Sequence, residues 1–156
     1  MHNNKLQEQL IKLKLDKQVS YYVKLADFSD ENALLDNIAS KVFTQQCIIF
    51  LDGTDTEDSY FADIAKKIKQ LCSQFFATLI IKQRADIVLL TEADGILLDK
   101  NSLTPHDVLG LLSEHTIIGM SENSDDEHVK FCIISQKIKS NFVNKDINVI
   151  ELKSNG

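Results

Sequence analysis

Residues 79–121 read LIIKQRADIVLLTEADGILLDKNSLTPHDVLGLLSEHTIIGMS, and this stretch decides the fold. Three apolar runs in it predict strands, and two helical segments separate them: strands at 76–81, 95–98 and 116–120, and helices at 84–91 and 105–112. Thr104, Pro105 and Asp107 form a typical helix start, with an N-cap, a Pro in the first turn and an acid at the third position. The runs are continuously apolar rather than alternating, which indicates strands buried on both faces in a parallel sheet with helical crossovers.

The same alternation of strand and helix continues on both sides of this stretch. The expected elements are strands at 19–25 and 47–51, helices at 30–40, 57–72 and 125–134, and a candidate last strand at 147–152. Ser29 and Ser124 are expected to cap the first and the last of these helices. Residues 1–18 favour an amphipathic helix, although Ile11, Leu13 and Leu15 fit strand alternation equally well.

We therefore expect one α/β domain over residues 1–156, with an N-terminal extension at 1–18 and a divergent C-terminal segment at 124–156. Two folds satisfy the pattern between them. One is a partial TIM-type βα barrel of about five to six strands, and the other is an open, doubly wound, three-layer α/β/α sheet. An all-β fold is disfavoured because the chain has one Pro and five Gly, too few breakers for many short strands.

The composition excludes several classes of function. The formal net charge is −6, and an acidic chain does not attract phosphate backbones, so we expect no nucleic-acid partner. No apolar run approaches the ~18 residues of a membrane span, so we expect no membrane partner. Cys47, Cys72 and Cys132 lie in separate apolar stretches without zinc-ligand spacing, which indicates reduced core thiols. Together with the lack of a signal peptide, this favours the cytoplasm.

Three blocks carry a resemblance to a known family: LIIKQRAD at 79–86, EADGILLDKNSL at 92–103 and IIGMS at 117–121. They resemble the thiamine phosphate synthase family, which includes the TenI-type proteins and has L-I-I-N-D-R-x-D, G-A-D-G-V-H-L-G-Q-x-D-L and I-I-G-V-S at the same spacings. The family-like βα units extend over residues 19–123. The resemblance implies a (β/α)₈ barrel, which takes ~200 residues or more. We therefore expect a truncated barrel here, without the family's late Gly-rich phosphate loops and lysine-bearing loop after Asn123.

The resemblance also implies a chemistry and the charges that it needs. Family enzymes join a pyrimidine pyrophosphate to a thiazole phosphate, and pyrophosphate leaves. The leaving group needs Mg²⁺ and Arg and Lys donors at the carboxyl ends of the strands. The family's Q-L-R-x-K motif falls on FLDGT at 50–54, so Asp52 stands at the Arg position and Thr54 at the Lys position. An anion there repels the phosphate that the family binds.

The family's metal ligands are replaced as well. Its N-D pair falls on Lys82 and Gln83, and its second metal-binding Asp falls on Ser102. The His and Gln of H-L-G-Q fall on Leu97 and Lys100. Because Gln and Ser are weak neutral ligands for Mg²⁺, we expect no metal, no cofactor and no catalytic residue in this chain.

The retained positions are mostly structural. Arg84 and Asp86 remain on the third helix, and the Asp94-Gly95 pair keeps the turn into its strand. The resemblance makes two further retained residues the candidate phosphate-binding positions, Gly119 and Ser121, although a loop or helix-capping hydroxyl also explains Ser121. Lys82 and Lys100 could form a new anion site, but solvated surface lysines are the simpler interpretation.

Three hypotheses follow for the function. The first is a thiamine phosphate synthase-like protein without that activity, with a thiazole or thiamine phosphate as candidate ligand. The second is an active thiamine-biosynthesis enzyme, either a thiamine phosphate synthase or a TenI-type enzyme that handles a thiazole phosphate. The third is a structural module, in which a homodimer covers the exposed sheet edge and apolar inner face of a partial barrel.

Overall fold

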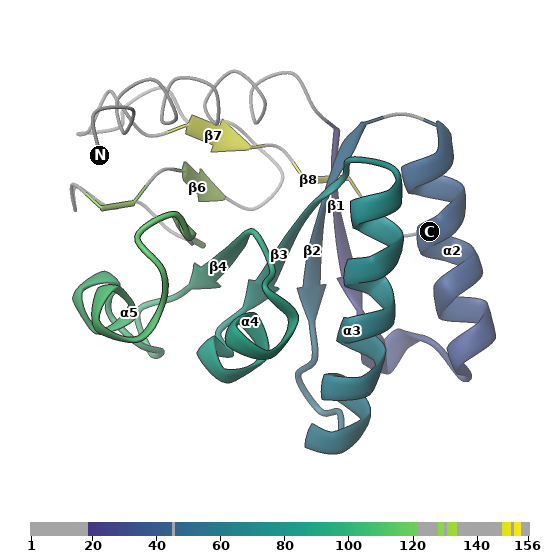
Figure 1. The fold of residues 1–156 in the computed structure, drawn as a ribbon, viewed down its shortest axis with the longest axis horizontal. Coiled ribbons are helices and arrows are strands. Elements are labelled where there is room, and N and C mark those ends of the chain that lie inside the picture. Colours follow the sequence, from purple (N-terminus) through teal and green to yellow (C-terminus); the bar gives the residue numbers. More distant parts are fainter. Residues whose placement is uncertain are drawn as a thin grey trace.

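The computed structural model describes residues 19–44, 46–121, 128–129, 131–133, 148–150 and 152–153. Its strands form one sheet in the order β7-β6-β5-β4-β3-β2-β1-β8, and every neighbouring pair is parallel (Figure 1). The strands are β1 (Val19–Lys24), β2 (Cys47–Asp52), β3 (Thr78–Lys82), β4 (Gly95–Leu98), β5 (Ile117–Met120), β6 (Phe131–Ile133), β7 (Asn148–Ile150) and β8 (Leu152–Lys153). The parallel sheet that continuous apolar runs predicted is thus present.

Four α-helices connect the first five strands. They are α2 (Glu31–Thr44), α3 (Asp58–Gln74), α4 (Ala85–Thr91) and α5 (Pro105–Leu111), and a short 3-10 helix, η1 (Leu25–Asp27), follows β1. At the start of α5, the amide of Asp107 donates to Thr104 Oγ1 and the amide of Thr104 donates to Asp107 Oδ2, at 3.2 and 3.1 Å. The predicted capping box is therefore confirmed.

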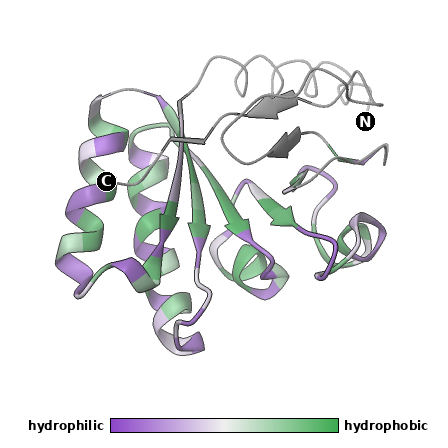
Figure 2. Cartoon of the chain, turned by 180° about the vertical axis from the view of Figure 1, so that it is seen from behind, coloured by the Kyte–Doolittle hydropathy of each residue, from purple (hydrophilic) through white to green (hydrophobic). Residues whose placement is uncertain are grey.

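The side chains on the two faces of the sheet belong to two different buried clusters. Residues such as Ile49, Leu51 and Ile81 belong to a large cluster that includes buried side chains of all four helices. The alternate residues of the same strands, among them Ile48 and Phe50, form a second cluster of strand residues. Figure 2 shows β2 and β3 green along most of their length, while α2 and α3 carry both colours. Among the elements that the structure describes, helices therefore cover one face of the sheet, as in a βα barrel and not as in a three-layer doubly wound sheet.

The sheet curls but does not close. β7 and β8 are separated by one residue along the chain, yet they occupy opposite ends of the strand order. Consecutive Cα atoms are ~3.8 Å apart, so the two ends of the sheet lie near one another. Among the described residues, no hydrogen-bonded pairing joins β7 to β8. The architecture is an open, barrel-like sheet, and the candidate strand at 147–152 is present as β7 and β8.

Two expectations from the sequence are wrong. Asp30, not Ser29, caps α2, because the Ala33 amide donates to Asp30 Oδ1 at 2.8 Å. A helix was expected at 125–134, but its predicted end is a strand: residues 131–133 form β6 and pair with β5 and β7. The rest of that expected helix lies largely outside the described residues, as does the expected helix over residues 1–18.

Cys47 and Cys72 are buried free thiols, as expected. Burial raises the pKa of Cys47 to about 11 and that of Cys72 to about 12, so both stay protonated near neutral pH. The side chain of Cys132 lies outside the described residues. In the part of the chain that the structure describes, no helix has the length and apolar character needed to cross a membrane.

Candidate functional site

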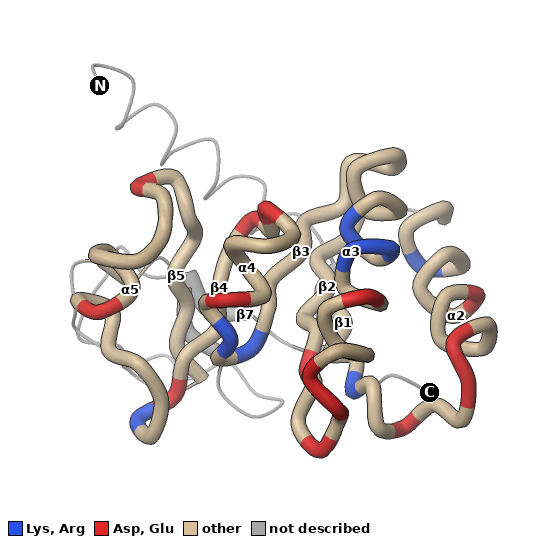
Figure 3. Tube along the Cα trace, turned by 60° about the horizontal axis from the view of Figure 1, so that its bottom comes forward, with Lys and Arg blue, Asp and Glu red and all other residues tan. Residues whose placement is uncertain are grey.

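The polar positions that the sequence singled out lie where the parallel strands end. Asp52 ends β2, Lys82 ends β3 and Ser121 follows β5. Since all these strands run in the same direction, their last residues share one edge of the sheet, which we call the carboxyl edge. Figure 3 shows acidic segments on the loop after β2 and basic segments along α3.

Asp52 is the best-defined group at the carboxyl edge. Its side chain is only 2% exposed, and the Tyr22 hydroxyl donates to its Oδ2 at 2.6 Å. The Thr54 amide donates to Oδ1 at 2.8 Å, and Lys82 Nζ lies 3.5 Å from Oδ2. Lys82 Nζ also lies 5.9 Å from the centre of the Tyr22 ring. Both oxygens of this carboxylate are therefore engaged by its own neighbours.

These contacts keep Asp52 ionised. Burial works to raise the pKa of Asp52, but the hydrogen bonds from Thr54 and Tyr22 and the charge of Lys82 outweigh it, so the pKa is lowered. Burial and the hydrogen bond to Asp52 raise the pKa of Tyr22, so the phenol keeps its proton. The Arg position of the family motif thus holds a buried carboxylate that is paired with Lys82 and Tyr22.

The positions of the two family metal ligands surround a different carboxylate. The Gln83 side-chain amide donates to Asp99 Oδ2, and the Asn101 amide donates to Oδ1 at 2.8 Å. Ser102 Oγ accepts from the Asp99 amide and donates to the Asp99 carbonyl, both at 3.0 Å. Gln83 has a φ of 63°, and its own amide donates to the Leu97 carbonyl at 2.8 Å. The loops after β3 and β4 are therefore held together by hydrogen bonds around Asp99.

The residues at this edge do not fit Mg²⁺. Asp52 is paired with Lys82, Asp99 is bonded by Gln83 and Asn101, and Ser102 satisfies the backbone of Asp99. Mg²⁺ requires near-octahedral oxygen ligands and usually one or two free carboxylates. Within the described residues, no group of three or more His, Cys, Asp and Glu side chains is arranged to hold a metal ion.

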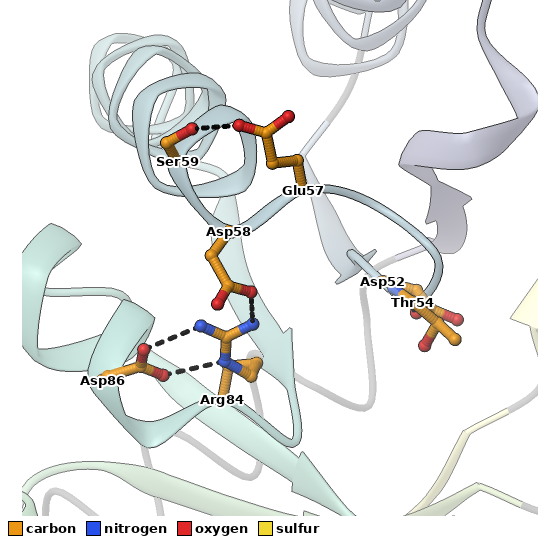
Figure 4. Close-up of polar contacts among 7 residues, drawn as sticks. All are labelled: Asp52, Thr54, Glu57, Asp58, Ser59, Arg84 and Asp86. Atoms are coloured by element: carbon orange, nitrogen blue, oxygen red, sulfur yellow. Dashed lines mark hydrogen bonds and ion pairs between the residues drawn. The ribbon is translucent and has the colours of Figure 1, made fainter.

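Arg84 is bound by two carboxylates and joins α3 to α4 (Figure 4). Its Nε and Nη2 donate to the two oxygens of Asp86 at 3.0 and 2.8 Å, and Nη1 donates to Asp58 at 2.9 Å. The bonds to Asp86 come first among the contacts that raise the pKa of Arg84, and they lower the pKa of Asp86. This guanidinium is thus already satisfied by protein carboxylates.

The other retained residues have separate roles. Asp94 Oδ2 accepts from the Leu79 amide at 2.8 Å, so the carboxylate ties the turn before β4 to the start of β3. Gly119 is buried within β5. Ser121 is exposed, and its amide donates to the Leu98 carbonyl at 2.8 Å. The phosphate-binding role of Gly119 and Ser121 stays a prediction.

Tyr22 and Asp99 also belong to this edge, although neither was expected there from the sequence. The sequence could have indicated Tyr22, because the hydroxyl of a Tyr in an apolar strand usually needs a hydrogen-bond partner. The expectation that Lys82 is a solvated surface lysine is wrong, since its side chain is 24% exposed and contacts Asp52. Lys100 is exposed, as that interpretation expected.

A curled parallel sheet, with helices on its outer face and polar loops at its carboxyl edge, defines a TIM-type βα protein. The family model described as Thiamine monophosphate synthase matches residues 26–135. The chain therefore belongs to the thiamine monophosphate synthase family.

Similar proteins support this assignment. Thiamine-phosphate synthase of Clostridium botulinum is 27% identical over 120 residues, which cover 77% of this chain and 56% of that protein. Thiamine-phosphate synthase of a Nostoc species is 34% identical over 76 residues, 49% of this chain and 22% of that protein. The structure of thiamine phosphate pyrophosphorylase from Pyrococcus furiosus matches with a TM-score of 0.68 at 17% identity, covering 80% of this chain and 62% of that one. The chain thus spans about half the length of the botulinum relative.

Proposed function

We propose that this chain is a thiamine phosphate synthase-like protein that does not make thiamine phosphate. The observation that supports the proposal is the state of Asp52, a buried carboxylate at the position where the family resemblance places a phosphate-binding Arg. Its pKa is lowered, so it carries a negative charge at neutral pH. A pyrophosphate brought to this position would meet an anion in place of a bidentate donor.

The nearby cations are not free to compensate. Lys82 lies against Asp52, and Arg84 is shared between Asp58 and Asp86. Moving either cation to a phosphate would leave its carboxylate partner unpaired, and for the buried Asp52 that is costly. These described side chains would therefore do little to stabilise the negative charge that develops on pyrophosphate as it leaves.

A phosphorylated thiazole or thiamine phosphate is the ligand that we propose for the carboxyl edge. The exposed Ser121 would provide a hydroxyl and a loop for the phosphate. Binding without a nearby cation is expected to be weak, because hydrogen bonds to phosphate are strongest when the donor is charged. Localisation in the cytoplasm and the homodimer also remain proposals.

The activity test uses the full chain with the pyrimidine pyrophosphate, the thiazole phosphate and Mg²⁺. We expect no thiamine phosphate above the level of a protein-free control, and its enzyme-dependent appearance would refute the proposal. Thermal-shift measurements with thiamine phosphate then compare wild type, Asp52→Asn and Asp55→Asn. Asp52→Asn removes the buried charge and releases Lys82, so we expect it to gain affinity for the phosphate.

Asp55→Asn is the matched control, because Asp55 is exposed on the same loop and the substitution makes the same change in charge. A gain confined to Asp52→Asn supports the electrostatic argument. An equal gain in both variants would show that only the overall charge matters. In that case the pairing of Asp52 with Lys82 would not explain weak phosphate binding.

A further inference from the structure

Three exposed phenylalanines gather where α2 and α3 end, and we call Phe43, Phe75 and Phe76 the aromatic patch. Phe43 lies in the last turn of α2, and Phe75 and Phe76 directly follow α3. The rings of Phe43 and Phe75 stack with 5.6 Å between their centres, so the two helix ends share one aromatic surface. The three residues are 71%, 37% and 74% exposed, in chain order. Figure 1 shows both helix ends at the end of the molecule where β2 and β3 begin.

The surroundings of the aromatic patch carry no charge along the chain. Residues 42–47 and 70–78 contain neither acids nor Lys, Arg or His. The nearest charged residues on the two helices are engaged elsewhere, since Lys41 Nζ donates to Asn37 Oδ1 at 2.6 Å and Lys69 Nζ lies 3.7 Å from Asp94. Aromatic side chains without charged neighbours are typical of the buried centre of a protein–protein interface.

Phe76 is held in a conformation that a bulky side chain rarely adopts. Its φ of 59° is left-handed, which costs free energy for any residue with a Cβ. The ring is exposed, so burial among the described residues offsets little of that cost. A large apolar ring kept at a strained and exposed position indicates a role outside the packing of this chain. Contact with another molecule accounts for both the strain and the exposure.

We propose that the aromatic patch is the contact surface of a homodimer, in which two copies place their patches against each other. Each copy has a net charge of −6, so identical chains approach at least electrostatic cost through a surface without charge. At ~200 Å² for a whole Phe side chain, the exposed parts of the three rings amount to ~360 Å² per copy. This is about half of the ~800 Å² per partner of a standard interface. We therefore expect a weak dimer, with a Kd on the order of 100 µM.

This inference gives a surface to the homodimer proposed above, and it does not depend on the chemistry of the carboxyl edge. The aromatic patch lies at the amino ends of β2 and β3, whereas Asp52 and Lys82 end these strands. A chain that proves monomeric would leave the argument from Asp52 intact. Enzymatic formation of thiamine phosphate would likewise leave the dimer surface untouched.

Sedimentation equilibrium of the full chain measures the self-association, and amide NMR over the same concentrations locates it. We expect a monomer–dimer equilibrium between about 10 µM and about 1 mM. The amides whose shifts depend on concentration should be those of Phe43, Thr44, Phe75 and Phe76. A chain that stays monomeric throughout, or shifts confined to other surfaces, would overturn the proposal.

Three variants separate the contact from folding. Phe76→Gly relieves the left-handed strain, so it should raise the stability of the monomer and yet weaken the dimer roughly tenfold or more. Phe43→Gln should weaken the dimer as well. Leu111→Gln is the matched control, because Leu111 is an exposed apolar residue of α5 and lies outside the aromatic patch. If Phe76→Gly and Phe43→Gln dimerise like wild type, or if Leu111→Gln weakens the dimer equally, the patch is not the contact surface.

Two other occupants of the patch give different results. If residues 1–18 of the same chain cover it, the full chain stays monomeric and dimerises only when residues 1–18 are deleted. If a lipid surface covers it, the monomeric chain sediments with phosphatidylcholine vesicles, and Phe76→Gly abolishes this binding. Either result would overturn the homodimer as the reason for the exposed rings.

Discussion

At the scale of single residues, Asp52 sets the electrostatics of the carboxyl edge. A buried carboxylate is tolerated only when its lone pairs are satisfied, and Tyr22, Thr54 and Lys82 provide the three partners. The same contacts that stabilise the ion withdraw it and Lys82 from any ligand. Asp52 at the family's Arg position therefore changes the local charge from positive to negative. It also leaves neither its own carboxylate nor the Lys82 ammonium group free to bind a ligand.

The pairing of Asp52 predicts a specific dependence of stability on pH. The folded pKa lies below the ordinary value of 3.8, so Asp52 contributes stability above that value and loses it as the pH falls through the lower, folded pKa. Asp52→Asn should lower the free energy of unfolding at pH 7 by about 1–3 kcal/mol. Urea unfolding from pH 7 into acid should show a smaller loss for the variant than for wild type. An equal loss of unfolding free energy in wild type and Asp52→Asn between pH 7 and acid would contradict this account. Asp55→Asn serves as the exposed control.

At the scale of elements, the end of α3 carries visible backbone strain. Phe76 has a φ of 59° and is 74% exposed. The Ala77 amide donates to the Cys72 carbonyl at 2.8 Å and closes the last turn around it. A left-handed residue at this position is usually Gly, because a side chain there is unfavourable.

Phe76→Gly should therefore stabilise the protein. Removing the side chain relieves the left-handed conformation and loses little burial, so the free energy of unfolding should rise by about 1 kcal/mol. Chemical unfolding measures the change. Phe43→Gly lies in the last turn of α2 and should instead destabilise, because Phe43 is helical and its ring stacks on Phe75 with 5.6 Å between the ring centres. A loss of stability in Phe76→Gly would show that the exposed ring makes contacts that matter.

Two glycines give opposite predictions for the same substitution. A Cβ on Gly95 in β4 would lie 2.5 Å from the Ile117 carbonyl oxygen of the paired strand, whereas a Cβ on Gly110 in α5 would meet nothing within 4 Å. Gly95→Ala should cost about 1–3 kcal/mol because the backbone of β5 must move. Gly110→Ala should add roughly 0.5–1 kcal/mol of stability. Urea unfolding of both variants measures the two changes in stability. If Gly95→Ala and Gly110→Ala change the free energy of unfolding equally, the close packing of β4 against β5 at Gly95 is contradicted.

Element prediction from the sequence succeeded where periodicity and apolar runs were long. The bounds of β4 were predicted in full, and α3 was predicted within two residues at each end. The helix at 125–134 failed because a three-residue apolar run cannot distinguish a short strand from a helix, and pairing with β5 and β7 settled it. The N-cap of α2 lies one residue after the predicted position, because Ser29 and Asp30 are both residue types that cap helices well.

At the scale of the whole molecule, the apolar inner face of the sheet is covered within the chain. Ile48, Phe50 and Ile80 are at most 1% exposed. A homodimer was expected from the sequence partly because it would cover this face, and that reason no longer applies to the described strands. The homodimer itself stays a prediction, which sedimentation equilibrium at several concentrations would test.

The burial pattern predicts the order of hydrogen exchange. β2 and β3 lie inside the strand order, with β1 on one side and β4 on the other, and all six residues of β2 are buried. Their amides should exchange most slowly and report the global free energy of unfolding, while those of the short helix α5 should exchange faster through local opening. Faster exchange in β2 than in α5 would show that the sheet is not the stable centre.

Residue types and spacing alone were enough to derive the alternation of strands and helices, the parallel sheet and the family resemblance from Leu79 to Ser121. These features depend on local periodicity and on blocks of neighbouring residues, which a sequence displays directly. Three-dimensional packing was needed to learn that helices cover one face of a curled sheet, and that Asp52 meets Tyr22 and Lys82. Those partners each lie 30 residues away along the chain, and only the pairing of parallel strands brings their side chains to the same edge.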